Sequence, residues 1–201
     1  PNLAIASLGL AEGIRAAGGP WFMEVAVHNF SNEPARDVSV ILGEDGHGRP
    51  AVTLAEIPPG KIAKERFLVH FPTAGPHDIS ARLESDPVEA DNHRYATVDL
   101  PPDVPVLLID GDVDARDAWY LSGALAPGGA VRTGIRPQIE PPRFLSQKPL
   151  KEFGAIIVTN VDRLDPSAVE ALETYVADGG GLAFFLGEET NASFFNDFLY
   201  R

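Results

Sequence analysis

A row of carboxylates follows a predicted buried strand and is a candidate for metal chemistry. Asp110, Asp112 and Asp114 stand at alternate positions directly after the apolar run at 106–109, and Asp117 lies close behind them. In open α/β sheets, ligands bind beyond the carboxyl ends of the strands. Carboxylate oxygens are the hard ligands that Mg²⁺ and Ca²⁺ prefer. Asp110, Asp112 and Asp114 are therefore the candidate metal ligands; no cofactor is expected apart from Mg²⁺ or Ca²⁺ as a candidate ion at these residues.

The preferred interpretation of this acidic row is structural. Asp112 or Asp114 would cap the helix predicted to follow, with Asp117 in its first turn, where the helix dipole stabilises a carboxylate. The row also resembles the start of the haloacid-dehalogenase phosphatases, which implies a Mg²⁺-dependent hydrolase with Asp110 as nucleophile. Asp114 stands where those enzymes have Thr. A small-molecule site at the same strand end is a further alternative.

A second acidic loop lies earlier in the chain. It contains Asp86, Glu89, Asp91 and Asn92. Such a loop can hold Ca²⁺. Asp and Asn also form side-chain turns that fix a loop without any ion, and this is the preferred interpretation.

The sequence lacks cysteine, and its five histidines all precede residue 94. Disulfides, thiolate zinc sites and a cysteine nucleophile are therefore excluded. No two histidines have the spacing of a zinc site, so we predict packing on strand faces or at the surface for all five: His28, His47, His70, His77 and His93.

The net charge of −13 limits the classes of partner. It offers no basic field for phosphates, so binding to nucleic acid or to anionic lipid is not expected. The composition, 44% hydrophobic and 22% charged, is that of a folded protein. No apolar run approaches the ~20 residues of a membrane span.

Residues 1–100 have the rhythm of an antiparallel immunoglobulin-like β-sandwich. Between residues 21 and 28, apolar side chains alternate with polar ones, which indicates a half-buried strand. Turn residues separate the apolar runs every 8–12 residues or so, as in sandwich domains. The predicted strands are 3–8, 21–30, 38–42, 52–57, 62–71, 77–83 and 95–100, with a turn at 29–34 and a loop at 43–48.

Residues 101–105 contain three prolines and are predicted to be a stiff linker to a second domain at 106–201. Beyond them the apolar runs become continuous, which is typical of strands buried on both faces of a parallel sheet. We predict a three-layer α/β domain with a mostly parallel and incomplete sheet. Its predicted strands are 106–109, 131–135, 155–159 and 182–186. Its predicted helices are 115–125, one that begins after the N-cap Asp165 and ends before Gly179, and one from 191 onward; 136–149 is expected to be irregular.

Two stretches of the first domain, VHNFSNEPARDVSV and DPVEADNHRYATVDL, resemble the CARDB-type immunoglobulin-like adhesion module. The residues that carry the resemblance are Asn29, Ala35, Val38, Asp86, Asp91 and Asn92. In the second domain, VPVLLIDGD, GAIIVTNV and VEALETYVADGGGLAFFLG resemble the flavodoxin-type fold of class I glutamine amidotransferases. This order of domains resembles the extracytoplasmic region of BatA-like bacterial membrane proteins. The resemblance implies an extracytoplasmic location, with membrane attachment only through helices outside this chain.

The amidotransferase resemblance carries an expectation about catalysis. Those enzymes place a Cys on a tight turn after a strand, and here that turn is Gly187–Thr190, with Glu188 and Glu189 in its middle. Neither a Cys nor a second-domain His is present to act as nucleophile or base. We therefore expect no enzyme, and predict a non-catalytic structural and protein-interaction module whose partners are proteins or other domains of a parent chain.

Overall fold

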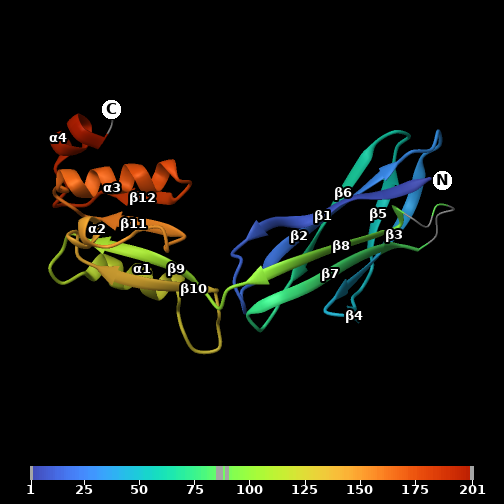
Figure 1. The fold of residues 1–201 in the computed structure, drawn as a ribbon, viewed down its shortest axis with the longest axis horizontal. Helices are drawn as coiled ribbons and strands as arrows, with labels where there is room; N and C mark the ends of the chain where they lie inside the picture. Colours follow the sequence, from blue (N-terminus) through green and yellow to red (C-terminus); the bar gives the residue numbers. More distant parts are fainter. Residues whose placement is uncertain (1, 85–87, 89–90, 200–201) are drawn as a thin grey trace. The chain divides into compact units, whose positions relative to one another are not determined.

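The computed structural model describes residues 2–84, 88 and 91–199. The chain forms two compact units, Pro1–Pro102 and Asp103–Arg201 (Figure 1). No helix among the described residues is both long and apolar enough to cross a membrane.

The described part of the N-terminal unit contains eight strands, and every pairing between them is antiparallel. One sheet has the order β1-β2-β6, and the other has the order β4-β3-β7-β8 with β5 also paired to β3. The strands are β1 (Leu3–Gly13), β2 (Trp21–Asn29), β3 (Ala35–Glu44), β4 (His47–Gly48), β5 (Val52–Ile57), β6 (Ile62–Val69), β7 (Gly75–Leu83) and β8 (His93–Leu100).

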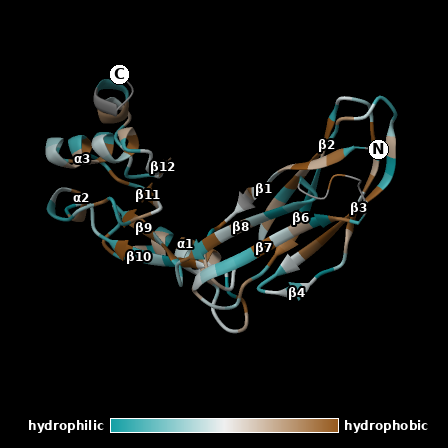
Figure 2. Cartoon of the chain, turned by 45° about the vertical axis from the view of Figure 1, so that its right-hand side comes forward, coloured by the Kyte–Doolittle hydropathy of each residue, from teal (hydrophilic) through white to brown (hydrophobic). Residues whose placement is uncertain are grey.

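One hydrophobic core lies between these two sheets. Strand β2 shows how the pattern builds it: Trp21, Met23, Val25 and Val27 are all completely buried. Hydrophobic and hydrophilic residues alternate along the strands of this unit (Figure 2), because successive side chains point to opposite faces of a sheet. The antiparallel sandwich agrees with the fold expected for residues 1–100.

The predicted loop at 43–48 is instead a tight hairpin. Glu44 and His47 pair across a two-residue turn, and the turn residues Asp45 and Gly46 have φ values of 46° and 77°. Asp-Gly is a strong signal for this turn because both positions require positive φ. The hairpin adds β4 to the seven predicted strands.

Asn29 organises the turn between β2 and β3. Its side chain is fully buried. The Nδ2 group donates to the carbonyl oxygens of Glu33 (2.8 Å) and Ile57 (2.9 Å). Its Oδ1 accepts from the backbone N–H (2.9 Å) and the hydroxyl (2.6 Å) of Ser31. All four hydrogen-bonding positions of the amide are filled, so this residue of the CARDB-like stretch has a structural role.

The C-terminal unit is a four-stranded, entirely parallel sheet with the order β10-β9-β11-β12. Its strands are β9 (Val104–Asp110), β10 (Ile135–Glu140), β11 (Ala155–Thr159) and β12 (Gly181–Phe185). Its helices are α1 (Arg116–Leu125), α2 (Phe144–Gln147), α3 (Pro166–Ala177) and α4 (Ala192–Phe194), followed by the π-helical turn η2 (Phe195–Leu199).

Helices pack on both faces of this sheet. Val106 and Leu108 of β9 face α1, together with Ala118 of that helix. Leu107 and Ile109 face the opposite way and join a larger core under α2 and α3. A strand that is buried on both faces needs apolar residues at successive positions. This explains the continuous apolar sequence of β9. The three layers agree with the predicted parallel sheet flanked by helices.

Several element boundaries differ from the prediction, and two differences in this unit bear on its architecture; the short helix α2 also lies in the stretch expected to be irregular. The second strand was predicted at 131–135 and lies at Ile135–Glu140, inside the stretch expected to be irregular, and this prediction was wrong. Pro137 obscured it, because proline lacks an N–H; it is tolerated here because β10 is at the edge of the sheet. Strand β9 begins at Val104, so the last two residues of the predicted linker belong to the sheet.

Candidate functional site

The carboxyl ends of β9 and β11 are where an open parallel sheet of this order would bind a ligand. The connections from β9 and β11 lead to helices on opposite faces of the sheet, and such a point normally leaves a crevice between the two loops. Asp110 ends β9, and Asn160 follows β11 directly. These two residues are therefore the first to examine for a ligand site at the strand ends.

Asp110 is buried, with 4% of its surface exposed. Its Oδ1 accepts a hydrogen bond from the backbone N–H of Asp112 (2.9 Å), and its Oδ2 accepts one from the backbone N–H of Ala118 (2.8 Å). Ala118 is the third residue of α1. A helix leaves its first N–H groups without internal partners, so Asp110 supplies the cap from the preceding strand.

The prediction that Asp112 or Asp114 caps α1 is therefore wrong. Ala115 holds the N-cap position in a left-handed conformation, with φ at 49°. Asp112 instead accepts from the backbone N–H of Asp114 (3.2 Å) and lies 3.4 Å from the Nε of Arg116. Asp117 is in the first turn of the helix, as predicted.

The three predicted metal ligands do not converge. Both oxygens of Asp110 are already engaged with backbone donors, Asp112 pairs within its own loop, and Asp114 is exposed. Among the residues that the structure describes, no group of three or more Asp, Glu or His side chains is placed to hold a metal ion. The Mg²⁺ or Ca²⁺ site at Asp110, Asp112 and Asp114 remains a prediction to be tested by titration.

Asn160 fills the space between the loops, and the sequence analysis missed it. Its backbone is left-handed, with φ at 48°. Its Oδ1 accepts from the backbone N–H of Glu189 (2.9 Å), and its own N–H donates to the carbonyl of Phe185 (2.9 Å). An added Cβ at Gly111 would overlap the Asn160 backbone, and one at Gly187 would overlap its side chain. The three loops are thus in close contact around one amide.

A signal for Asn160 is present in the sequence. Asparagine is one of the few residues other than glycine that adopt the left-handed conformation readily, and it stands directly after an apolar strand. The signal alone indicates a sharp turn. That the amide also bridges to a third loop, after β12, depends on the order of the strands in the sheet.

The turn Gly187–Thr190, where the amidotransferase resemblance would place a Cys, is closed by hydrogen bonds between its two ends. Gly187 donates its N–H to the hydroxyl of Thr190 (2.9 Å), and Thr190 returns a hydrogen bond to the Gly187 carbonyl (3.2 Å). A nucleophile elbow holds its reactive residue in a sharp, strained turn. Glu188 and Glu189 are exposed, and neither has positive φ.

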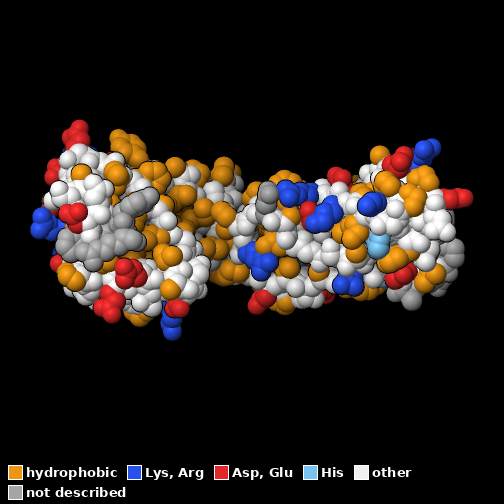
Figure 3. Space-filling view, turned by 90° about the horizontal axis from the view of Figure 1, so that it is seen from above, with side chains coloured by type: hydrophobic (Ala, Val, Ile, Leu, Met, Phe, Trp, Pro, Cys, Tyr) orange, Lys and Arg blue, Asp and Glu red, His pale blue; other side chains and the backbone are white. Residues whose placement is uncertain are grey.

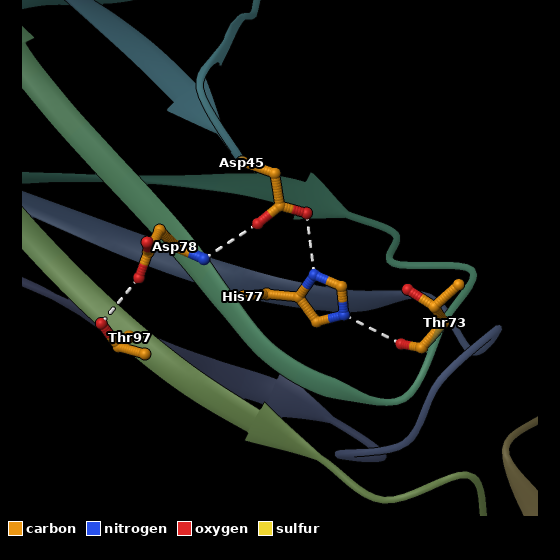
Figure 4. A network of polar contacts seen from close by, with 5 residues as sticks. All are labelled: Asp45, Thr73, His77, Asp78 and Thr97. Carbon is orange, nitrogen blue, oxygen red and sulfur yellow. Dashed lines mark hydrogen bonds and ion pairs between the residues drawn. The ribbon is translucent and has the colours of Figure 1, made fainter.

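His77 lies in a network of polar contacts with Asp45 and Thr73 (Figure 4). The residue is 6% exposed and lies in strand β7, so it packs on a strand face, as one of the two predicted alternatives has it. Its Nδ1 lies 2.8 Å from a carboxylate oxygen of Asp45, and its Nε2 lies 2.8 Å from the carbonyl oxygen of Thr73. Phe71 stacks on the ring with centroids 4.2 Å apart. Because both nitrogens face acceptors, the doubly protonated imidazolium fits this position.

Electrostatics agree with that geometry. Burial lowers the pKa of His77, but the hydrogen bonds to Asp45 and Thr73 and the negative charges of Asp45 and Asp78 outweigh it, so its pKa is raised. Burial raises the pKa of Asp45, and the hydrogen bonds from His77 and from the backbone of Asp78 outweigh it, so its pKa is lowered. With both ring nitrogens occupied, His77 has no site for a general base; it joins the β3–β4 turn to the turn before β7.

The second acidic loop is described only in part. Asp86 and Glu89 lie outside the described residues. Asn92 is buried, and its backbone carbonyl accepts a hydrogen bond from the backbone N–H of Leu83 (3.0 Å). Whether this loop holds Ca²⁺ or only forms side-chain turns stays a prediction.

No family model matches this sequence, and no curated protein matches it. Among solved structures, the chain is similar to the CARDB domain of a Pyrococcus furiosus protein, in a solution structure with 15% identity over 51% of this chain and 96% of that one, at a TM-score of 0.44. It is similar to a crystal structure of that CARDB domain in complex with di-metal ions, with 17% identity over 50% of this chain and 94% of that one (TM-score 0.43). A domain of a candidate cell-surface protein from Methanosarcina acetivorans has 18% identity over 50% of this chain and 91% of that one (TM-score 0.41).

Proposed function

We propose that this chain is a non-catalytic structural and protein-interaction module of a larger, membrane-anchored bacterial protein. In this proposal the sandwich is a CARDB-type spacer or adhesive domain, and the α/β unit is an amidotransferase-like domain without chemistry, arranged as in BatA-like proteins. The partners are proteins or other domains of the parent chain. The location is the extracytoplasmic side of a bacterial membrane.

The observation that carries the proposal is the state of Asp110. Its two oxygens accept from two backbone N–H groups, at 2.9 and 2.8 Å, and the side chain is buried. A nucleophilic or metal-binding carboxylate has to present an oxygen to its substrate or ion. Asn160 further reduces the space at the same strand ends. These contacts and the burial of Asp110 support a structural role for the carboxylate that is best placed for chemistry.

The rival function is a Mg²⁺-dependent phosphatase-like hydrolase, or a cation or small-molecule site, at Asp110–Asp114. The test is hydrolysis of an aryl phosphate and an aryl ester by the purified chain, with and without Mg²⁺ or Ca²⁺. We expect no turnover and no metal-dependent rise in Tm. Hydrolysis that is lost in Asp110→Asn but kept in the control Asp178→Asn, an exposed carboxylate outside the acidic row, would overturn the non-catalytic proposal.

The proposed location has its own test. In cells that express the natural protein, protease added outside spheroplasts should digest this segment. Protection of the segment until the inner membrane is lysed would contradict the extracytoplasmic location while leaving the non-catalytic proposal intact.

A further inference from the structure

Strand β12 offers an open edge. It is last in the sheet order, and no other strand in the described part of the chain pairs with its outer side. The carbonyl of Phe185 accepts from the N–H of Asn160, on the side of β11. The backbone groups of successive residues in a strand point to opposite sides, so the N–H and C=O groups of Leu182 and Phe184 point outward. Unpaired groups of this kind are a template for another strand.

An apolar groove runs beside this edge, between α3 and β12. Its volume is about 620 Å³, and its apolar lining comes mainly from Val169, Leu172, Val176, Leu182, Phe184 and Phe195. The ring of Phe195 packs edge-on against Phe184, with centroids 5.5 Å apart. Val176 is 45% exposed and Leu186, which also lines the groove, is 65% exposed. Large side chains thus remain in contact with water along one face of the edge.

The opposite face of β12 is apolar as well. Ala183 and Phe185 point away from the groove, and Phe185 is 55% exposed. A strand added to β12 would place alternate side chains in the groove and against Phe185, while its backbone paired with the outward groups of Leu182 and Phe184. A helix could fill the groove but would leave those backbone groups unpaired. The edge therefore selects an extended occupant.

Charge indicates what should flank that occupant. From Leu164 to Leu199 the sequence has seven Asp or Glu and no Lys, Arg or His. Glu173 lines the groove itself, and Glu188 and Glu189 are exposed just beyond β12. On the visible face of this unit, acidic side chains lie among the apolar ones, and Lys or Arg side chains are seen at its rim (Figure 3). A second copy of this chain would bring the same negative charges together, so the field favours a basic partner.

We propose that the outer edge of β12 and the α3 groove bind an extended segment of a partner protein as a fifth strand. The segment has apolar residues at alternate positions and Lys or Arg at both ends. This proposal rests on the proposed interaction function and names the partner's chemistry.

The probe is a fluorescein-labelled nonapeptide with valine and threonine alternating in its centre and two lysines at each end. Binding to the full chain is followed by fluorescence anisotropy, and we expect it to weaken as salt is added. Two control peptides carry N-methyl groups on alternate central residues, in opposite phases. Only one phase removes the N–H groups that would pair with β12, so we expect one control to lose binding and the other to keep it.

Two variants of the chain locate the site. Val176→Asp places a charge in the groove and should weaken binding about tenfold, and Glu173→Lys should weaken it about three- to fivefold. The matched controls are Val131→Asp and Glu152→Lys, exposed positions of the same unit outside the groove, which should bind like the parent.

Three results overturn the proposal: no peptide binding at millimolar concentrations, equal binding of both N-methylated peptides, or binding that Val176→Asp does not weaken. A dimer of the chain that Val176→Asp dissociates would also overturn it, because the occupant would then be a second copy. The non-catalytic proposal fails only if the chain hydrolyses an aryl phosphate or ester, and none of the results above involves hydrolysis. The two proposals can therefore fail independently of each other.

Discussion

Two regions of the same sheet differ in how their polar groups are paired. One is formed by the carboxyl ends of β9 and β11, and the other is the outer edge of β12. At the strand ends, the side chains of Asp110 and Asn160 accept hydrogen bonds from backbone N–H groups of the β9–α1 loop, the first turn of α1 and the loop after β12. Along β12, outward backbone groups face no strand among the described residues, and the nearby side chains are apolar. The contrast is between polar side chains satisfied within the fold at the strand ends and backbone groups that face no strand at the edge.

The largest expected effect on stability is that of Asp110→Asn, which tests the hydrogen bonds at the strand ends. The amide keeps the shape but replaces one accepting oxygen with a donor, which leaves a buried backbone N–H without its partner. We expect a loss of about 2–4 kcal/mol in the free energy of unfolding. Urea denaturation followed by the far-UV helix signal measures it, because all described helices lie in the C-terminal unit. The control Asp114→Asn, at an exposed side chain, should cost less than about 0.5 kcal/mol. Equal losses in the two variants would remove the distinction.

His77→Gln extends the comparison to a buried polar site held by charge. Replacing the ring removes its hydrogen bonds to Asp45 and Thr73, and we expect a loss of about 2 kcal/mol at pH 6. Because the pKa of His77 is raised on folding, its contribution is complete below its ordinary pKa of 6.5 and is lost as pH rises through the folded value. Because the pKa of Asp45 is lowered, its contribution is lost in acid.

The parent should therefore be more stable at pH 6 than at pH 8, and His77→Gln should flatten that difference. Denaturation followed by the fluorescence of buried Trp21, in a Trp119→Phe background, measures it for the N-terminal unit. His93→Gln is the control, because that ring is exposed. A parent whose stability is unchanged between the two pH values would contradict the imidazolium.

Asn160→Gly tests how much the side chain of Asn160 stabilises the contact between the loops at the strand ends. Glycine keeps the positive φ of this position without strain, so the substitution removes only the side chain that binds the Glu189 N–H and packs on Gly187. We expect a loss of about 1 kcal/mol. Asn160→Ala should cost about 1 kcal/mol more, because alanine is strained in the left-handed region. If the alanine and glycine variants lose the same free energy of unfolding, the left-handed backbone at position 160 does not affect stability.

The smallest effect is expected at the edge. Val176→Asp should change the free energy of unfolding by less than about 0.5 kcal/mol, because the side chain is 45% exposed and faces the groove. The same urea denaturation measures it. If Val176→Asp lowered the free energy of unfolding as much as Asp110→Asn, the groove would be part of the folded core. The proposed difference between the strand ends and the edge would then be wrong.

Local patterns predicted much of the fold. The alternation of β2, the continuous run of β9 and the Asp165-Pro166 start of α3 follow from the periods of strands and from the needs of a helix terminus, which act over a few residues. Even so, Asp165 makes no side-chain capping hydrogen bond, although it holds the N-cap position. The β10 error has a similar origin: whether Pro137 can lie in a strand depends on whether that strand is at an edge.

The sequence by itself determined the two kinds of sheet, the sites of most turns, and the absence of cysteine and of any histidine after residue 93. Only the tertiary structure decided that Asp110 rather than its neighbours caps α1, that Asn160 closes the strand ends, and that Asp45 meets His77 across 32 residues of sequence. The physical reason is that periodicity and turns arise from neighbouring residues. The partner of a buried polar group is set by which distant segments pack together, and an open edge exists only once the order of the strands is known.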